Sequence, residues 1–284
     1  MVTMKRAWLT SILTTVGVAG VALLVLSGPP AVGQQGGSAA GGETAPIPRM
    51  ADGTPDLSGV WWIGRDLQIR PLDSPPPAPR PAPTGPPPQR PPSFTDLYQP
   101  WAAEKAATLS DKDDPTLRCV PTAFGTLNRS LLSVGFVGQI VQTPNLVVML
   151  TETFHGFRLV PTDGRPHRDD APPSYRGDSV GHWEGDTLVV DQRNFNDKAW
   201  LFAEGRVSFH SDQLRIVERY TMTDADTIEI DAVIEDPGVL TGPWTVPMQT
   251  LVRAPFDQIL EVGCSGIETW ALMEAASRQN YGKD

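Results

Sequence analysis

Between residues 138 and 253 the sequence is a series of short apolar runs separated by turn residues. Hairpins are predicted at Pro144-Asn145, at Gly185-Asp186 and within Thr223–Asp226. No helical pattern separates these runs, which is typical of an antiparallel meander. About eight to ten such strands predict an all-β, mainly antiparallel fold, either an up-and-down barrel or a strongly curved sheet with short peripheral helices. A two-sheet sandwich is the alternative.

The N-terminal segment has the pattern of an export signal. Lys5 and Arg6 precede an uncharged stretch over residues 7–26, and a small-x-small pattern ends at Gly33. Residues 1–33 are therefore predicted to be a secretory signal peptide, which places the mature protein in the periplasm or outside the cell. An uncleaved membrane anchor is the alternative, because about twenty uncharged residues could span a bilayer. Residues 34–50 are interpreted as a flexible leader.

One β-barrel-like domain is predicted over residues 51–284. Residues 71–92 contain twelve prolines, which fix φ and lack an amide donor, so this segment is predicted to be a disordered insert. Docking of a partner through its PxxP pattern is the other possibility. Helices are predicted at 97–110 and 267–279, and the run 258–264 is predicted to be a closing strand.

Charge and cysteine usage narrow the function. The formal net charge is −10 and the mature part has no basic run, so nucleic acid is not an expected partner. The two cysteines of an exported chain, Cys119 and Cys264, are predicted to form a disulfide rather than a zinc site. There is no GxSxG, GxGxxG or Walker motif, so neither a nucleotide nor another organic cofactor is expected.

Strand alternation identifies the residues that point inward. In the third predicted hairpin, Glu218 lies in an otherwise apolar row with Ile216 and Tyr220. A buried carboxylate must be paired or protonated. Glu218 is therefore either a structural partner for an arginine such as Arg158 or a catalytic or ligand-binding group.

The hairpin over residues 181–197 is rich in polar groups. With a turn at Gly185-Asp186, His182 lies opposite Val189 and on the same sheet face as Asp191. Diagonal neighbours on a sheet can interact, so these two residues could form a histidine–carboxylate dyad. The alternative is a hairpin that exposes both side chains to solvent.

All four histidines fall within residues 155–210, and in a meander they could converge at one mouth of the barrel. Metal binding is an alternative for such a set of ligands, although no closely spaced histidine pair is present and no metal is predicted. These residues are His155, His167, His182 and His210.

Several motifs together resemble a family of uncharacterised secreted bacterial proteins. They include "PDLSGVW" (55–61), "IVQTPNLVVML" (140–150), "DGRPH" (163–167) and "SVGHWEGDTLVVDQRNFND" (179–197). The resemblance covers most of the mature chain and implies a lipocalin-like barrel and an exported location. It implies no particular reaction.

Three functions are compatible with these patterns. The leading hypothesis is a cofactor-independent acid–base enzyme (lyase, isomerase or hydrolase) that acts on a small, partly apolar molecule. A periplasmic carrier or sensor is second, and a structural envelope protein is third. In the enzyme, His182 with Asp191 would be the base, His155 a second acid, and Arg158 with Arg165 would hold an anionic or carbonyl group. Further residues predicted to contact the ligand are His167, Trp183, Asn194, His210 and Glu218.

Overall fold

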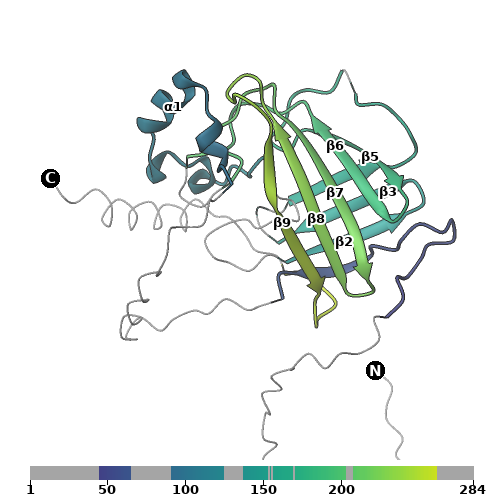
Figure 1. The fold of residues 1–284 in the computed structure, drawn as a ribbon. Helices are drawn as coiled ribbons and strands as arrows, with labels where there is room; N and C mark the ends of the chain where they lie inside the picture. The colour runs from purple at the N-terminus through teal and green to yellow at the C-terminus, as the bar shows by residue number, and fades with distance from the viewer. Residues whose placement is uncertain are drawn as a thin grey trace, which may run out of the picture. The chain divides into compact units, whose positions relative to one another are not determined.

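The computed structural model describes residues 45–64, 91–124, 137–152, 154, 156–168, 170–202 and 207–260. These residues form a single curved sheet of nine strands (Figure 1). The strands are β1 Gly59–Trp62, β2 Val137–Thr143, β3 Leu146–Thr151, β4 Gly156–Pro161, β5 Asp178–Glu184, β6 Thr187–Arg193, β7 Arg215–Asp224, β8 Thr227–Glu235 and β9 Trp244–Arg253. The helices are α1 Pro100–Ala107 and the 3₁₀ turns η1 Phe94–Leu97, η2 Asp111–Asp113 and η3 Pro115–Arg118.

The sheet is an up-and-down meander that almost closes into a barrel, as predicted. Its order is β4-β3-β2-β1-β9-β8-β7-β6-β5, and every hydrogen-bonded pair is antiparallel. Strands that follow each other in sequence are therefore neighbours in the sheet, and β1 pairs with β9. The only sequential pair without a hydrogen-bonded ladder is β4 and β5, which lie side by side. We call this junction the seam.

The parallel direction of β4 and β5 at the seam follows from the odd number of strands. Nine strands that alternate in direction cannot close with antiparallel neighbours throughout, so β4 and β5 run in the same direction. Two adjacent strands with the same direction require a connection that returns along their whole length. Residues 162–177 are this connection, because they begin beside the β2–β3 turn, where the amide of Thr162 donates to Asn145 O, and end at the first residue of β5.

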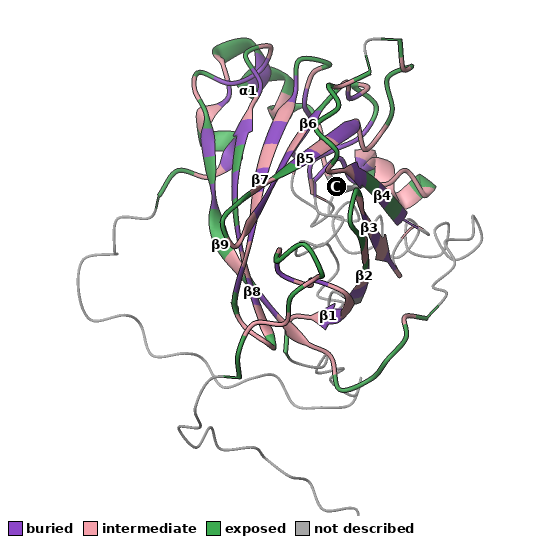
Figure 2. Ribbon diagram, turned by 90° about the vertical axis from the view of Figure 1, so that its right-hand side faces the viewer, coloured by how far each residue is buried: buried purple, intermediate pink, exposed green. Residues whose placement is uncertain are grey.

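The hairpin predictions are confirmed, and buried and less buried residues alternate along the strands, as in β7 (Figure 2). The β5–β6 register pairs His182 with Val189 and Val180 with Asp191, as the turn at Gly185-Asp186 predicts. A one-residue slip would turn every side chain to the opposite face, so the buried apolar set fixes this register.

Two apolar clusters fill the interior, one toward each end. At the end that carries α1, aromatic residues such as Phe195, Trp200 and Trp244 form the first cluster. Toward the opposite end, the second cluster contains Leu57, Trp61 and other strand residues. The chain around α1 is held on the barrel by hydrogen bonds between residues 97–99 and 239–241, and Tyr98 donates to Phe209 O.

Other predictions differ from the structure or fall outside it. The helix predicted at 97–110 is shorter, because Pro100 begins α1 and Thr108 ends it. Residues 258–260, the described part of a predicted strand at 258–264, are not in a strand. The signal peptide, most of the proline-rich insert, the helix at 267–279 and Cys264 lie outside the described residues. The Cys119–Cys264 disulfide therefore stays a prediction. Within the described part of the chain, no helix combines the length and hydrophobicity that crossing a bilayer requires.

We predict that Gly181→Ala destabilises the protein through the seam. A methyl group on Gly181 in β5 would lie 2.7 Å from Val160 Cγ1 in β4 and 3.3 Å from Leu188 Cδ1. Overpacking of this kind typically costs about 1–3 kcal/mol. Gly242→Ala is the matched control, because its added methyl would have no atom within 4 Å and should change the free energy of unfolding by less than about 0.5 kcal/mol. Urea denaturation measures both, and equal effects would show that the seam is not packed in this way.

Candidate functional site

A polar layer crosses the barrel interior between the two apolar clusters. Along the inner face of β7, Ile216 belongs to the first cluster and Tyr220 to the second, and Glu218 lies between them. Arg158 projects from β4, and Gln192 comes from β6. Both are buried with Glu218. We define the polar layer as Arg158, Gln192, Glu218 and Tyr220.

An ion pair is the centre of the polar layer. Arg158 Nη1 donates to Glu218 Oε2, and the side chains are 2 % and 0 % exposed. Gln192 Nε2 donates to the same oxygen at 2.7 Å. The sequence left two alternatives for Glu218, a structural partner for an arginine or a functional group, and the structure shows it paired with Arg158. The same contacts also leave other atoms of the layer available.

Five polar atoms of the layer are buried and make no hydrogen bond of normal geometry to a described residue, although the Tyr220 hydroxyl lies close enough to Glu218 and Arg158 to interact with both. They are Arg158 Nε, Arg158 Nη2, Gln192 Oε1, Glu218 Oε1 and the hydroxyl oxygen of Tyr220. Buried polar groups are normally paired, and each unpaired group costs about 1–3 kcal/mol. What sets the layer apart is their clustering, because these five atoms belong to four residues that lie side by side in the interior.

The charges in and beside the layer influence one another. Burial opposes the charge on Arg158, but attraction to Glu218 outweighs it and raises the pKa of this guanidinium. Burial also raises the pKa of Tyr220 well above its ordinary value, and the negative charge of Glu218 adds to this effect. Arg176, at the end of the connection across the seam, has its pKa lowered to about 10 by burial and by repulsion from Arg158. The layer therefore lies close to a second guanidinium.

The predicted His182–Asp191 dyad is not formed. Both side chains are on the outer face, and His182 is 60 % exposed and hydrogen-bonded to Glu184 at 3.0 Å. Asp191 instead receives two hydrogen bonds from Arg215 and one from Arg193. Burial opposes its charge, but these arginines outweigh it and lower the pKa of Asp191. The sheet face was predicted correctly; the partners were not.

Three other predicted site residues lie in or against the connection 162–177, outside the polar layer. His167 Nδ1 is 3.1 Å from Asp178 Oδ2, and its Nε2 is 3.8 Å from Asp191 Oδ1. Arg165 is exposed and pairs with its neighbour Asp163. Asn194, at φ 62°, donates to Ala171 O at 2.7 Å and so holds the connection in place.

The described histidines do not converge. His167 contacts Asp178, the first residue of β5, and His182 lies near the other end of that strand. His210 is buried beside Phe195, with its Nδ1 2.8 Å from Ser211 O. His155 lies outside the described residues. Within the described ranges, no three His, Cys, Asp or Glu side chains gather closely enough to hold a metal ion. Trp183 does face inward, where it packs against the second apolar cluster.

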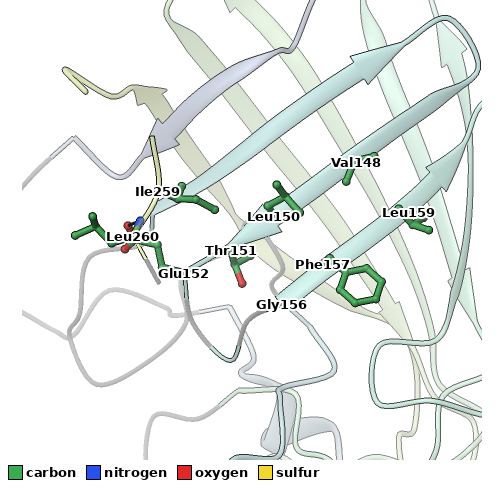
Figure 3. A pocket seen from close by; sticks show the side chains of 9 residues that line it. All are labelled: Val148, Leu150, Thr151, Glu152, Gly156, Phe157, Leu159, Ile259 and Leu260. Carbon is green, nitrogen blue, oxygen red and sulfur yellow. Dashed lines mark hydrogen bonds between the residues drawn. The ribbon is translucent and has the colours of Figure 1, made fainter. Parts of the chain in front are cut away.

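A separate groove of about 510 Å³ lies on the outer face of β3 and β4 (Figure 3). Its floor is apolar, and Phe157 and Leu159 are 61 % and 50 % exposed. Ile259 and Leu260 form one wall, and the amide of Leu260 donates to Glu152 Oε1 at 2.7 Å. The groove has no buried ionisable group, so it contrasts chemically with the interior layer.

Comparisons with protein-family models, curated proteins and solved structures find no match for this chain. The resemblance to a family of secreted bacterial proteins therefore stays a prediction.

Sequence reasoning missed two members of the polar layer. Gln192 follows Leu188 and Val190 in simple alternation along β6, so continuing that alternation would have placed it inside the barrel. Tyr220 was assigned to the inner face, but its hydroxyl was not considered. Arg176 could not be found in this way, because it lies in an irregular connection.

We predict that His210 makes stability depend on pH. Burial lowers the pKa of His210 below 6.5, so the folded state binds this proton less readily than the unfolded state. Stability is then complete above pH of about 6.5 and falls on acidification, by at most about 1.4 kcal/mol per pH unit. Denaturation at pH 7 and pH 5.5 should show this loss, and His210→Gln should remove it. His182→Gln, at an exposed position, is the control, and an unchanged pH dependence in His210→Gln would contradict the assignment.

Proposed function

We propose that this protein binds a small molecule inside its barrel, with the polar layer as the recognition site. The observation that carries the proposal is the set of five buried polar atoms that make no hydrogen bond of normal geometry to a described residue. A ligand that supplies complementary groups would satisfy them. Barrels of about eight strands enclose enough space for side chains or for one small ligand.

The surroundings of the layer define the rest of the ligand. Apolar residues flank it on both sides, with Ile216 toward one end of the barrel and Tyr220 and Val190 toward the other. A molecule bound there would place a polar group on the layer and an apolar body against these walls. Ligand sites are commonly apolar with a few such polar groups.

Binding is favoured over acid–base catalysis by the positions of the predicted catalytic residues. His182 and Asp191 lie on the outer face with partners of their own. We therefore place the carrier or sensor hypothesis ahead of the enzyme. Export to the periplasm or the outside of the cell, based on residues 1–33, remains part of the proposal.

The test is a thermal-shift and ligand-observed NMR screen of small molecules against wild type and Tyr220→Phe. The Tyr220 hydroxyl lies beside Glu218 and Arg158 without a hydrogen bond of normal geometry to either, so its removal should lower the stability of the free protein by less than the loss of a full hydrogen bond, about 1 kcal/mol. It should weaken ligand binding by roughly 3- to 10-fold, the value of one hydrogen bond.

Tyr98→Phe is the matched control. Its hydroxyl donates to Phe209 O at 2.7 Å, so this variant should lose about 1 kcal/mol of stability and keep its affinity. Leu159→Ser tests the outer groove. Ligands that are lost in Leu159→Ser and bind Tyr220→Phe as they bind wild type would overturn the interior site.

A further inference from the structure

The unpaired atoms of Arg158 are adjacent on one edge of its guanidinium. Nη1 is engaged by Glu218, whereas Nε and Nη2 are buried and make no hydrogen bond of normal geometry to a described residue, with the Tyr220 hydroxyl nearby. The Nε–H and Nη2–H bonds of arginine are parallel and form a planar fork, which matches the two oxygens of a carboxylate. A single neutral acceptor would satisfy only half of this fork.

The chain shows elsewhere how this fork is used. Arg215 donates from Nε to Asp191 Oδ1 at 3.0 Å and from Nη2 to Asp191 Oδ2 at 2.9 Å. The carboxylate thus lies across the same edge that Arg158 leaves open. The difference is burial, because the Arg215 side chain is 38 % exposed and that of Arg158 is 2 % exposed.

The charges in and beside the layer also favour an anionic ligand. Arg158 and Glu218 balance each other, and Arg176 lies near enough to repel Arg158. An anion on the open edge of the Arg158 guanidinium would be attracted by Arg158 and would lie close to Arg176. An anion buried without compensating charge would be strongly disfavoured. A neutral ligand would leave the repulsion between the two arginines unchanged.

From this geometry we infer that the ligand is a monocarboxylate with an apolar body, held bidentately by Nε and Nη2 of Arg158. This inference rests on the proposed interior binding site and specifies the chemistry that it recognises. Glu218 is a positioning residue, because its contact with Nη1 fixes the guanidinium so that the open edge faces the ligand. The Tyr220 hydroxyl lies beside Arg158 and Glu218, and we expect it to donate its hydrogen to an oxygen of the bound carboxylate.

The test uses matched pairs of probes on the full chain. Hexanoate, octanoate, benzoate and phenylacetate are titrated at pH 7.4 by isothermal calorimetry and ligand-observed NMR, each beside its primary amide. The amide keeps the shape but lacks the charge and one of the two acceptors. At least one carboxylate should bind at least 10-fold more tightly than its amide. Its addition should also shift the Nε–H resonance of Arg158.

Arg158→Lys keeps the positive charge beside Glu218 but removes the fork, so the affinity for the carboxylate should fall at least 10-fold. Arg215→Lys is the control, since it removes the same fork on the outer face and should leave the affinity unchanged. Circular dichroism checks that both variants fold. If Arg158→Lys does not fold, the carboxylate-to-amide ratio and the Arg158 resonance in wild type decide the question.

The outcomes separate this inference from the proposed function. If amides bind as tightly as carboxylates and both weaken in Tyr220→Phe, interior binding stands and the carboxylate assignment is wrong. The assignment is also wrong if carboxylates bind equally well to a folded Arg158→Lys. If no carboxylate binds but a neutral molecule from the screen does, only this inference fails. If no small molecule binds in the interior, both proposals fail.

Discussion

The barrel depends on one ion pair across its interior. Arg158 belongs to β4, which has a hydrogen-bonded neighbour on one side only, and Glu218 belongs to β7, which is paired on both sides. The contact therefore ties a strand that is paired on one side to a strand that is paired on both sides. Removing one partner of a buried pair leaves an uncompensated charge and typically costs about 3–5 kcal/mol. A pair of apolar side chains could fill the same space without that risk, so packing alone does not explain why charges are present.

The position of the ion pair explains how the apolar interior is divided. Without Glu218, the alternating residues from Leu214, just before β7, to Met222 would form one continuous apolar row. The carboxylate divides that row, and the interior has two apolar clusters instead of one core. A purely structural polar layer would be expected to satisfy its own atoms, as the outer pairs around Asp191 do. This layer does so only in part, and the open atoms belong to all four of its residues.

Period-two alternation is the part of this structure that the sequence predicts best. It correctly places the hairpin turns, the inner faces of β7 and β8 and the β5–β6 register, because an error of one residue would bury polar side chains. It does not predict which polar groups pair on an exposed face. His182 can reach Glu184 two residues away on its own strand, and guanidinium forks compete better than an imidazole for Asp191. The relative direction of β4 and β5 could not be predicted from local sequence patterns either, because it depends on the total number of strands.

The seam and the polar layer are connected through a single segment. An odd number of alternating strands requires β4 and β5 to run in the same direction, and residues 162–177 must then return along the barrel. Arg176 stands at the end of that return. Its Nη2 lies 2.5 Å from where a Cβ on Gly156 would be, so only glycine at the start of β4 permits this approach. The connection that the parallel direction of β4 and β5 requires thus ends beside the polar layer, where Arg176 lies near Arg158.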